Sequence, residues 1–164
     1  MINKDTKIYG SFSKKAGNNG CRFFNAAFAE HNIDALYRSY SVDNIEHAVF
    51  SAKTLGFSGF AVSMPFKIDV LRHVDDISDE VSYVGSSNTV INTEGKLKAY
   101  NTDYYASLSL LKNLIGEVCI LGNGGLSKAV QSAAKKITLS SLSSLPKKSP
   151  PIMSLGLYKT NDST

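Results

Sequence analysis

Short β-type runs alternate with helical patterns over the first 64 residues, and this alternation restricts the fold more than any other feature of the sequence. The β-type runs are residues 7–10, 35–42 and 59–64, with helical patterns at 21–31 and 45–56 between them. Strands that alternate with helices favour parallel pairing, because each helix returns the chain to the edge where the next strand begins. The sequence therefore predicts an α/β layered domain.

The next segments carry capping and turn signals. Asp43 is the predicted N-cap of the second helix, since Glu46 three residues later completes a capping box. Residues 88–92 and 96–100 predict a β-hairpin, and leucines at helical spacing predict a helix over 106–115. An acidic cluster is interpreted as a solvated helix face and turn; its members are Asp75, Asp76, Asp79 and Glu80.

Composition excludes several classes of protein. The 164 residues, 43% hydrophobic and 20% charged, can bury one core or one core plus a fragment of another. No apolar run approaches the ~18–20 residues of a membrane span, and the first residues lack a signal peptide, so a cytoplasmic protein without membrane association is expected. The net charge of +4 comes without a basic stripe, which makes nucleic acid an unexpected partner.

Cys21 and Cys119 have no nearby metal-ligating residues, so no metal site is expected and both are interpreted as small apolar residues.

The stretch AVSMPFK, residues 61–67, places Lys67 just past a proline that ends a buried strand. Taken by itself, this lysine is best interpreted as a surface residue. Residues 117–130 then predict a strand, a glycine turn and a helix start, an arrangement that lets backbone N–H groups approach a pyrophosphate. Gly122 would supply the tight turn, Gly124 the close approach, and Gly125 or Ala129 the packing of the helix against the strand. A glycine turn that binds no ligand is the alternative.

Several blocks together resemble the shikimate and quinate dehydrogenase family, in its shikimate 5-dehydrogenase-like subgroup. The blocks occur in the family's order and extend the resemblance from residue 7 to about residue 136; they are SFS (11–13), AVSMPFK (61–67), SSNTV (86–90), AYNTD (99–103) and LGNGGLSKAV (121–130). The resemblance implies a three-layer α/β/α substrate-binding domain with a mostly parallel sheet, followed by a truncated Rossmann-type βα unit. The implied domains are 1–103 for substrate, a connecting helix at 104–116, and the start of an NADP-binding domain at 117–137.

The resemblance also implies an activity, the reduction of 3-dehydroshikimate to shikimate with NADPH in the chorismate pathway of aromatic amino acid biosynthesis. Lys67 and Asp103 match the family's catalytic lysine and aspartate. During hydride transfer an alkoxide-like oxygen develops on the substrate, and a partly desolvated lysine can protonate or stabilise it. A nearby carboxylate holds the lysine in place.

Substrate and cofactor contacts carry over position by position. Ser11 and Ser13 match the serines that bind the substrate carboxylate, with a serine-rich turn as the alternative, and Ser63 keeps a hydroxyl at a threonine position. Asn88, together with Asp103, matches residues that bind ring hydroxyls. Shikimate or 3-dehydroshikimate is the implied ligand, with quinate or a modified analogue as alternatives because Ala61, Phe24 and Cys21 depart from the family pattern. The cofactor contacts implied for NADP are Gly122, Asn123, Gly124, Gly125 and Leu126.

The C-terminal segment departs from the family. Residues 138–164 are rich in serine and contain three of the four prolines, a composition typical of disordered or non-native sequence, and fewer than fifty residues follow Glu117. A frameshift or premature stop would explain this, and a fragment or a gene split across two chains would look similar. Exposed apolar surface and sheet edges would then favour association, for example as a homodimer. Two hypotheses remain open: an NADP-dependent oxidoreductase, and a non-catalytic remnant or substrate-binding module that lacks a complete cofactor domain.

Overall fold

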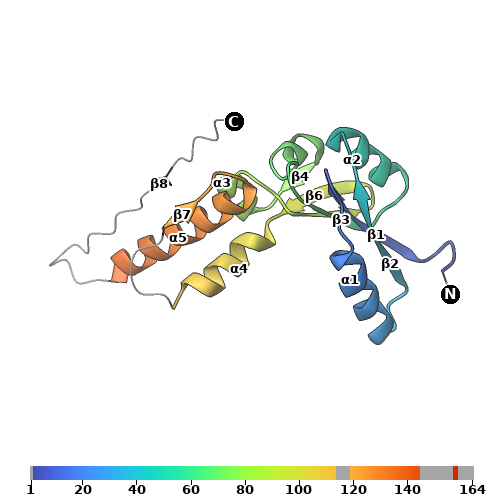
Figure 1. The fold of residues 1–164 in the computed structure, drawn as a ribbon, viewed down its shortest axis with the longest axis horizontal. Helices are drawn as coiled ribbons and strands as arrows, with labels where there is room; N and C mark the ends of the chain where they lie inside the picture. The colour runs from blue at the N-terminus through green and yellow to red at the C-terminus, as the bar shows by residue number, and fades with distance from the viewer. Residues whose placement is uncertain (1, 114–118, 145–156, 159–164) are drawn as a thin grey trace.

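The computed structural model describes residues 2–113, 119–144 and 157–158, and the chain path is shown in Figure 1. Strands and helices alternate from the N-terminus, as the hydrophobic periodicity predicts. The first region contains strands β1 (Lys7–Ser13), β2 (Ala35–Ser41), β3 (Gly59–Val62), β4 (Asp76–Ile77), β5 (Thr89–Thr93) and β6 (Lys96–Tyr100). Its helices are α1 (Asn19–Glu30), α2 (Ile45–Thr54), the 3₁₀-helix η1 (Asp69–His73) and α3 (Asp79–Val84).

The first six strands form one sheet in the order β2-β1-β3-β5-β6-β4. Strand β1 pairs in parallel with both β2 and β3, and β4 pairs in parallel with β6. Strand β5 is antiparallel to both β3 and β6. The prediction of a mostly parallel sheet is therefore confirmed, with the β5–β6 hairpin as its antiparallel part.

Helices α1 and α2 lie on opposite faces of this sheet (Figure 1). On one face, Phe28 of α1 contacts Tyr9, with ring centroids 5.8 Å apart. On the other face, Phe12 packs on Phe60 with centroids 4.9 Å apart, in the same buried cluster as α2. Side chains alternate between faces along a strand, so Tyr9 and Phe12 point to opposite sides. The predicted three-layer α/β/α arrangement is thus confirmed.

The main core lies between the sheet and α2. Its central strands contribute Val90 and Ala99, both fully buried, and Leu97, which is 1% exposed. The apolar residues of α2 that close this core are Ile45, Ala48, Val49 and Ala52. These helical positions recur at spacings of three and four, which puts them on one face.

The predicted N-cap of α2 is wrong by one residue. Asn44, in extended conformation, caps the helix, and its side-chain oxygen accepts a hydrogen bond from the His47 N–H at 3.0 Å. Asp43 instead forms an exposed ion pair with Lys14. The predicted hairpin is confirmed, with Glu94 and Gly95 in its turn at φ +52° and +83°, as a tight hairpin turn requires.

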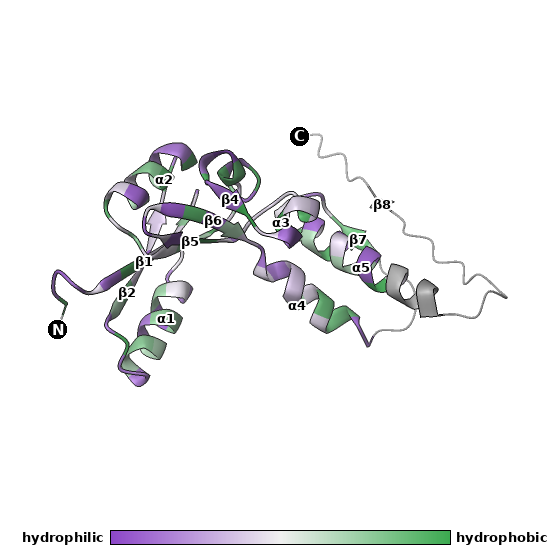
Figure 2. Ribbon diagram, turned by 180° about the vertical axis from the view of Figure 1, so that it is seen from behind, coloured by the Kyte–Doolittle hydropathy of each residue, from purple (hydrophilic) through white to green (hydrophobic). Residues whose placement is uncertain are grey.

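A second group of elements follows the hairpin. It comprises α4 (Thr102–Leu111), β7 (Ile120–Leu121), α5 (Gly125–Ser144) and β8 (Leu157–Tyr158), with β7 and β8 pairing in parallel. Val84, Tyr104, Ala129 and Ala133 form a small core between α3, α4 and α5. The last turns of α4 are apolar in Figure 2, and Leu110 there is 75% exposed.

Helix boundaries in this group differ from the predicted ones. Helix α4 begins at Thr102 because Asn101 caps it, four residues before the leucine pattern begins. Helix α5 runs past the predicted boundary at residue 137, since no glycine or proline occurs before Pro146 to end it. The remainder of the predicted C-terminal segment, residues 145–156 and 159–164, lies outside the described residues. Among the described residues, no helix combines the length and apolar character that crossing a bilayer requires.

Candidate active site

The structure brings Lys67 and Asp103 together although they are 36 residues apart. Lys67 follows β3, after a Met64–Pro65 peptide bond that is cis, and Asp103 lies in the first turn of α4. The Lys67 Nζ lies 2.6 Å from Asp103 Oδ2, and the two side chains are only 15% and 24% exposed. An ion pair that is largely removed from water interacts more strongly than an exposed one. The site therefore holds a partly desolvated ammonium group at a fixed position.

Two local features fix this pair. Asn101 caps α4 by accepting the Tyr104 N–H at 3.1 Å, which sets the first turn that carries Asp103. The stem of Lys67 packs against the start of α5, where a Cβ added to Gly125 would lie 2.8 Å from Lys67 Cβ. Position 125 therefore requires glycine, because the start of α5 and the Lys67 side chain lie too close for a Cβ atom between them.

Polar residues form one row across the sheet beside this pair. Strand register aligns Ser39 with Ser11, Ser11 with Ala61, Ala61 with Thr89, and Thr89 with Tyr100. Residues aligned in this way have side chains on the same face. Ala61, one of the positions that depart from the family pattern, therefore interrupts a row of hydroxyl groups.

The predicted serines occupy β1 and the loop after β3. Ser11 donates a hydrogen bond from Oγ to Ser39 Oγ at 3.0 Å. Ser13 lies two residues further along β1, on the same face as Ser11. Ser63 follows β3, and its backbone N–H donates to the Phe12 carbonyl at 2.9 Å, beside Ser13. The three hydroxyl-bearing residues thus gather where β1 and β3 end.

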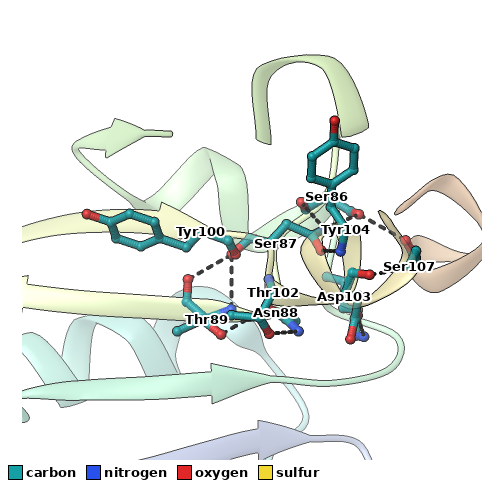
Figure 3. Close-up of polar contacts among 12 residues, drawn as sticks. Ser86, Ser87, Asn88, Thr89, Tyr100, Thr102, Asp103, Tyr104 and Ser107 are labelled. Atoms are coloured by element: carbon teal, nitrogen blue, oxygen red, sulfur yellow. Dashed lines mark hydrogen bonds and ion pairs between the residues drawn. The ribbon is translucent and has the colours of Figure 1, made fainter. Parts of the chain in front are cut away.

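Asn88 is held by its neighbours in a way that leaves part of its amide available (Figure 3). Its Nδ2 donates to Thr102 Oγ1 at 2.8 Å, and its Oδ1 accepts from the Thr102 N–H at 3.0 Å. Thr89 Oγ1 also donates to this Oδ1 at 2.9 Å. An amide nitrogen has two N–H bonds, and within the described residues only one of them is used, so the other can bind a ligand. Thr102 is followed by Asp103 in the chain, so these hydrogen bonds tie Asn88 to the residue next to Asp103.

The predicted glycine turn lies between β7 and α5. Gly122 has φ +111°, a conformation that L side chains rarely adopt, and a Cβ added to Gly124 would meet no atom within 4 Å. Asn123 and Leu126 are exposed beside it. Helix α5 begins directly after this turn, so the positive end of its dipole lies at the turn formed by residues 122–124. The residues present fit the pyrophosphate part of a dinucleotide.

Sequence reasoning missed a role for Cys21. Its Sγ donates to Ser39 Oγ at 3.3 Å and accepts from the Ser39 N–H at 3.2 Å. Hydrogen bonding to Ser39 lowers the pKa of the Cys21 thiol. Cys21 is therefore part of the hydrogen-bonded group around Ser11 and not merely a small apolar residue. Only the packing of α1 against β2, which the sequence did not reveal, could have shown this.

The interpretation of Glu80 as a solvated carboxylate is wrong. Glu80 is 2% exposed, whereas Asp75, Asp76 and Asp79 of the same cluster are exposed. Asp75 and Asp76 form ion pairs with lysines, and a backbone hydrogen bond from Leu97 lowers the pKa of Asp75 further. The helical period of α3 explains why Glu80 is buried and Asp79 is not, since Glu80 falls on the face that carries the buried Val81 and Val84.

Residues 20–90 match the family model of the shikimate dehydrogenase substrate binding domain. A shikimate dehydrogenase-like protein of Haemophilus influenzae is 38% identical over 139 residues, which are 82% of this chain and 51% of the relative. Through its substrate-binding domain, this chain belongs to the shikimate dehydrogenase family. The shikimate dehydrogenase (NADP(+)) of Pyrococcus furiosus is 34% identical over 84% of this chain and 53% of its own length.

Solved structures agree with this family membership. The structure of a shikimate 5-dehydrogenase-like protein superimposes with a TM-score of 0.75 at 37% sequence identity, covering 85% of this chain and 52% of that one. This shikimate dehydrogenase family member thus spans about half the length of the relatives it matches.

Proposed function

We propose that this chain carries the substrate-binding and proton-transfer groups of an NADP-dependent shikimate dehydrogenase, which converts 3-dehydroshikimate to shikimate. The observation that carries the proposal is the Lys67–Asp103 ion pair, 2.6 Å long and mostly buried. It lies between a polar row of the sheet and the start of α5, so one ligand could contact all of them. Family membership supports the same reaction class.

The chemistry follows from the needs of a ketone that becomes an alcohol. The carbonyl carbon gains a hydride and the carbonyl oxygen gains a proton, so negative charge develops on that oxygen. The Lys67 ammonium donates the proton and its charge stabilises the developing oxyanion. Lys67 then recovers a proton from solvent. Asp103 accepts a hydrogen bond from Lys67 throughout, which keeps the ammonium oriented.

The ring substituents of the substrate are assigned to the surrounding polar groups. Ser11 and Ser13 would bind the carboxylate, and Ser63 would add a hydroxyl beside them. The free N–H of Asn88 and the carboxylate of Asp103 would bind ring hydroxyls. A polyol needs such converging donors and acceptors, because each unpaired buried group costs binding energy.

The cofactor would be held at the glycine turn. Gly122 and Gly124 leave room for a pyrophosphate beside the N-terminus of α5, with Asn123, Gly125 and Leu126 around it. When bound, NADPH would supply the hydride. Among the described residues, β7, α5 and β8 contribute one βαβ arrangement to such a domain.

The test is NADPH oxidation with 3-dehydroshikimate, comparing the wild-type chain with Lys67→Ala. We expect turnover to fall by about 10²–10⁴-fold, the usual contribution of a positioned proton donor. Lys53→Ala is the matched control, because Lys53 also pairs with an aspartate, Asp75, but at the surface. Turnover in Lys67→Ala equal to that of Lys53→Ala would contradict the assigned role of Lys67.

The second candidate is a substrate-binding module without turnover. It is favoured by the match to the substrate binding domain model over residues 20–90, a range that stops before the glycine turn. Calorimetric titration with shikimate distinguishes the two: binding that is lost in Lys67→Ala, without NADPH oxidation at high protein concentration, would support the module. Neither binding nor turnover in the wild-type chain would reject both candidates for this chain.

A further inference from the structure

Glu80 is a buried carboxylate that the proposed reaction does not use. It lies in the first turn of α3 and is 2% exposed. Among the described residues, no cation pairs with it; its partners are neutral donors. Ser78 Oγ donates to Oε1 at 2.6 Å, the Asn101 N–H donates to Oε1 at 3.1 Å, and the Tyr105 hydroxyl donates to Oε2 at 3.1 Å. A buried charge of this kind needs such bonds to offset its lost hydration.

Two of these donors belong to the start of α4. Asn101 is the N-cap and Tyr105 lies four residues later, one turn further along the same helix. The two carboxylate oxygens of Glu80 therefore hold α4 at both ends of its first turn. Asp103 lies between these two attachment points.

Asn101 extends the connection to the glycine turn. It is fully buried; its Oδ1 accepts the Tyr104 N–H at 3.1 Å, and its Nδ2 donates to the Ser86 carbonyl at 2.8 Å. Ser86 Oγ, in turn, donates to the Gly125 carbonyl at 3.0 Å. The stem of Lys67 packs on that same Gly125. One buried hydrogen-bonded chain thus reaches both members of the ion pair, Asp103 through α4 and Lys67 through α5.

The charge of Glu80 makes its hold on α4 stronger than a neutral group would. Hydrogen bonds to an ionised acceptor are shorter and about twice as strong as neutral ones. Burial by itself would raise the pKa of Glu80, but the hydrogen bonds from Ser78, Asn101 and Tyr105 outweigh burial and hold the pKa below its usual value. Glu80 therefore stays ionised at neutral pH.

We propose that Glu80 is a positioning residue for the Lys67–Asp103 pair, acting through Asn101 on the first turn of α4. It touches neither the ion pair nor the polar row, and its effect is to restrict where the Asp103 carboxylate lies. Of these effects, only the one on ligand affinity rests on the proposed function.

The test compares three variants by amide hydrogen exchange and by shikimate titration. Glu80→Ala removes the hold on α4, whereas Glu80→Gln keeps the size and the acceptor for Ser78 and Asn101 but loses the charge and the acceptor for Tyr105. Val81→Ala is the matched control, since Val81 is the next residue, is 1% exposed, and belongs to no part of this network. In Glu80→Ala we expect the protection of the Tyr104 amide, corrected for global stability, to fall at least tenfold. In Glu80→Gln the loss should be intermediate, about three- to tenfold, because the charge and the bond from Tyr105 are lost, and in Val81→Ala the protection should stay within about threefold of wild type.

Shikimate affinity should follow the same order, about tenfold weaker in Glu80→Ala, less weakened in Glu80→Gln and little changed in Val81→Ala. Equal losses of Tyr104 protection in Glu80→Ala and Val81→Ala would overturn the proposal, because the effect would then be general destabilisation. If the wild-type chain binds no shikimate, the proposed substrate fails, and the exchange measurement still decides the role of Glu80.

A second variant covers the case in which Glu80→Ala does not fold. Tyr105→Phe removes one hydroxyl from a side chain that is 56% exposed and leaves the rest of the network in place. We expect a two- to fivefold loss of Tyr104 protection. Unchanged protection in Tyr105→Phe would overturn the two-point attachment.

Discussion

Substituting Gly125 by alanine tests the contact on which the candidate site depends. The new Cβ would lie 2.8 Å from Lys67 Cβ and 3.1 Å from Lys67 Cδ. Two carbon atoms prefer about 3.5–4.0 Å, so the nearer contact is too short by about 0.7 Å. Because Lys67 Cβ is fixed to the backbone, either α5 or the Lys67 loop must shift.

The cost can be worked from these distances. Overpacking of this kind costs about 1–3 kcal/mol, while replacing glycine by alanine stabilises by about 0.4–1 kcal/mol through the unfolded chain. Gly125→Ala should therefore be about 0.5–2 kcal/mol less stable than wild type. Gly124→Ala is the matched control: its Cβ would meet no atom within 4 Å, so the stabilising contribution alone remains.

Urea unfolding of both variants measures the difference. We expect Gly124→Ala to be more stable than Gly125→Ala by about 1–3 kcal/mol, which corresponds to a midpoint difference of about 1 M urea at a slope of about 2 kcal/mol/M. The comparison cancels the change in unfolded-state entropy, which is the same for both substitutions. Equal midpoints would refute the close approach of α5 to Lys67.

Three further predictions concern the fold. Leu97→Ala should cost about 2–5 kcal/mol because Leu97 is 1% exposed, whereas Leu110→Ala at a 75% exposed position should stay within about 0.5 kcal/mol, both by urea unfolding. Asn44→Ala should cost about 1 kcal/mol as a lost N-cap, and Asp43→Asn should change the free energy of unfolding much less because its ion pair is exposed. Since the folded pKa of Glu80 lies below its unfolded value, its stabilising effect is present above the unfolded pKa and is lost as pH falls through the folded pKa; Glu80→Gln should remove that component from acid unfolding curves.

Local sequence patterns were enough to predict the main elements of the fold. Alternating strands and helices, the hairpin turn at Glu94 and Gly95, and the glycine turn at Gly122 all depend on residues close together in the chain. The N-cap of α2 shows the limit of this approach. Asp43 and Asn44 are both good capping residues, and only the backbone, extended at Asn44, decides between them.

The parts that sequence could not predict depend on distant partners. Asp75 and Glu80 belong to one acidic cluster, yet the first pairs with Lys53 at the surface and the second is buried against α4. Likewise, the hydroxyl row that contains Ser39 and Ser11 exists only because β1 and β2 pair in one particular register. Charge and residue type are visible in the sequence, but burial and register are properties of the assembled sheet.

The burial of Lys67 follows from how the two regions meet. An ammonium group loses hydration when α5 covers its stem, and the carboxylate of Asp103 at 2.6 Å offsets that loss. The start of α5 can approach so closely only because Gly125 has no side chain. The same glycine therefore belongs both to the cofactor-type turn and to the packing of the lysine. A substrate domain without α5 would leave Lys67 more hydrated and its interaction with Asp103 weaker, so the site requires both regions even though its charged pair comes from the loop after β3 and from α4.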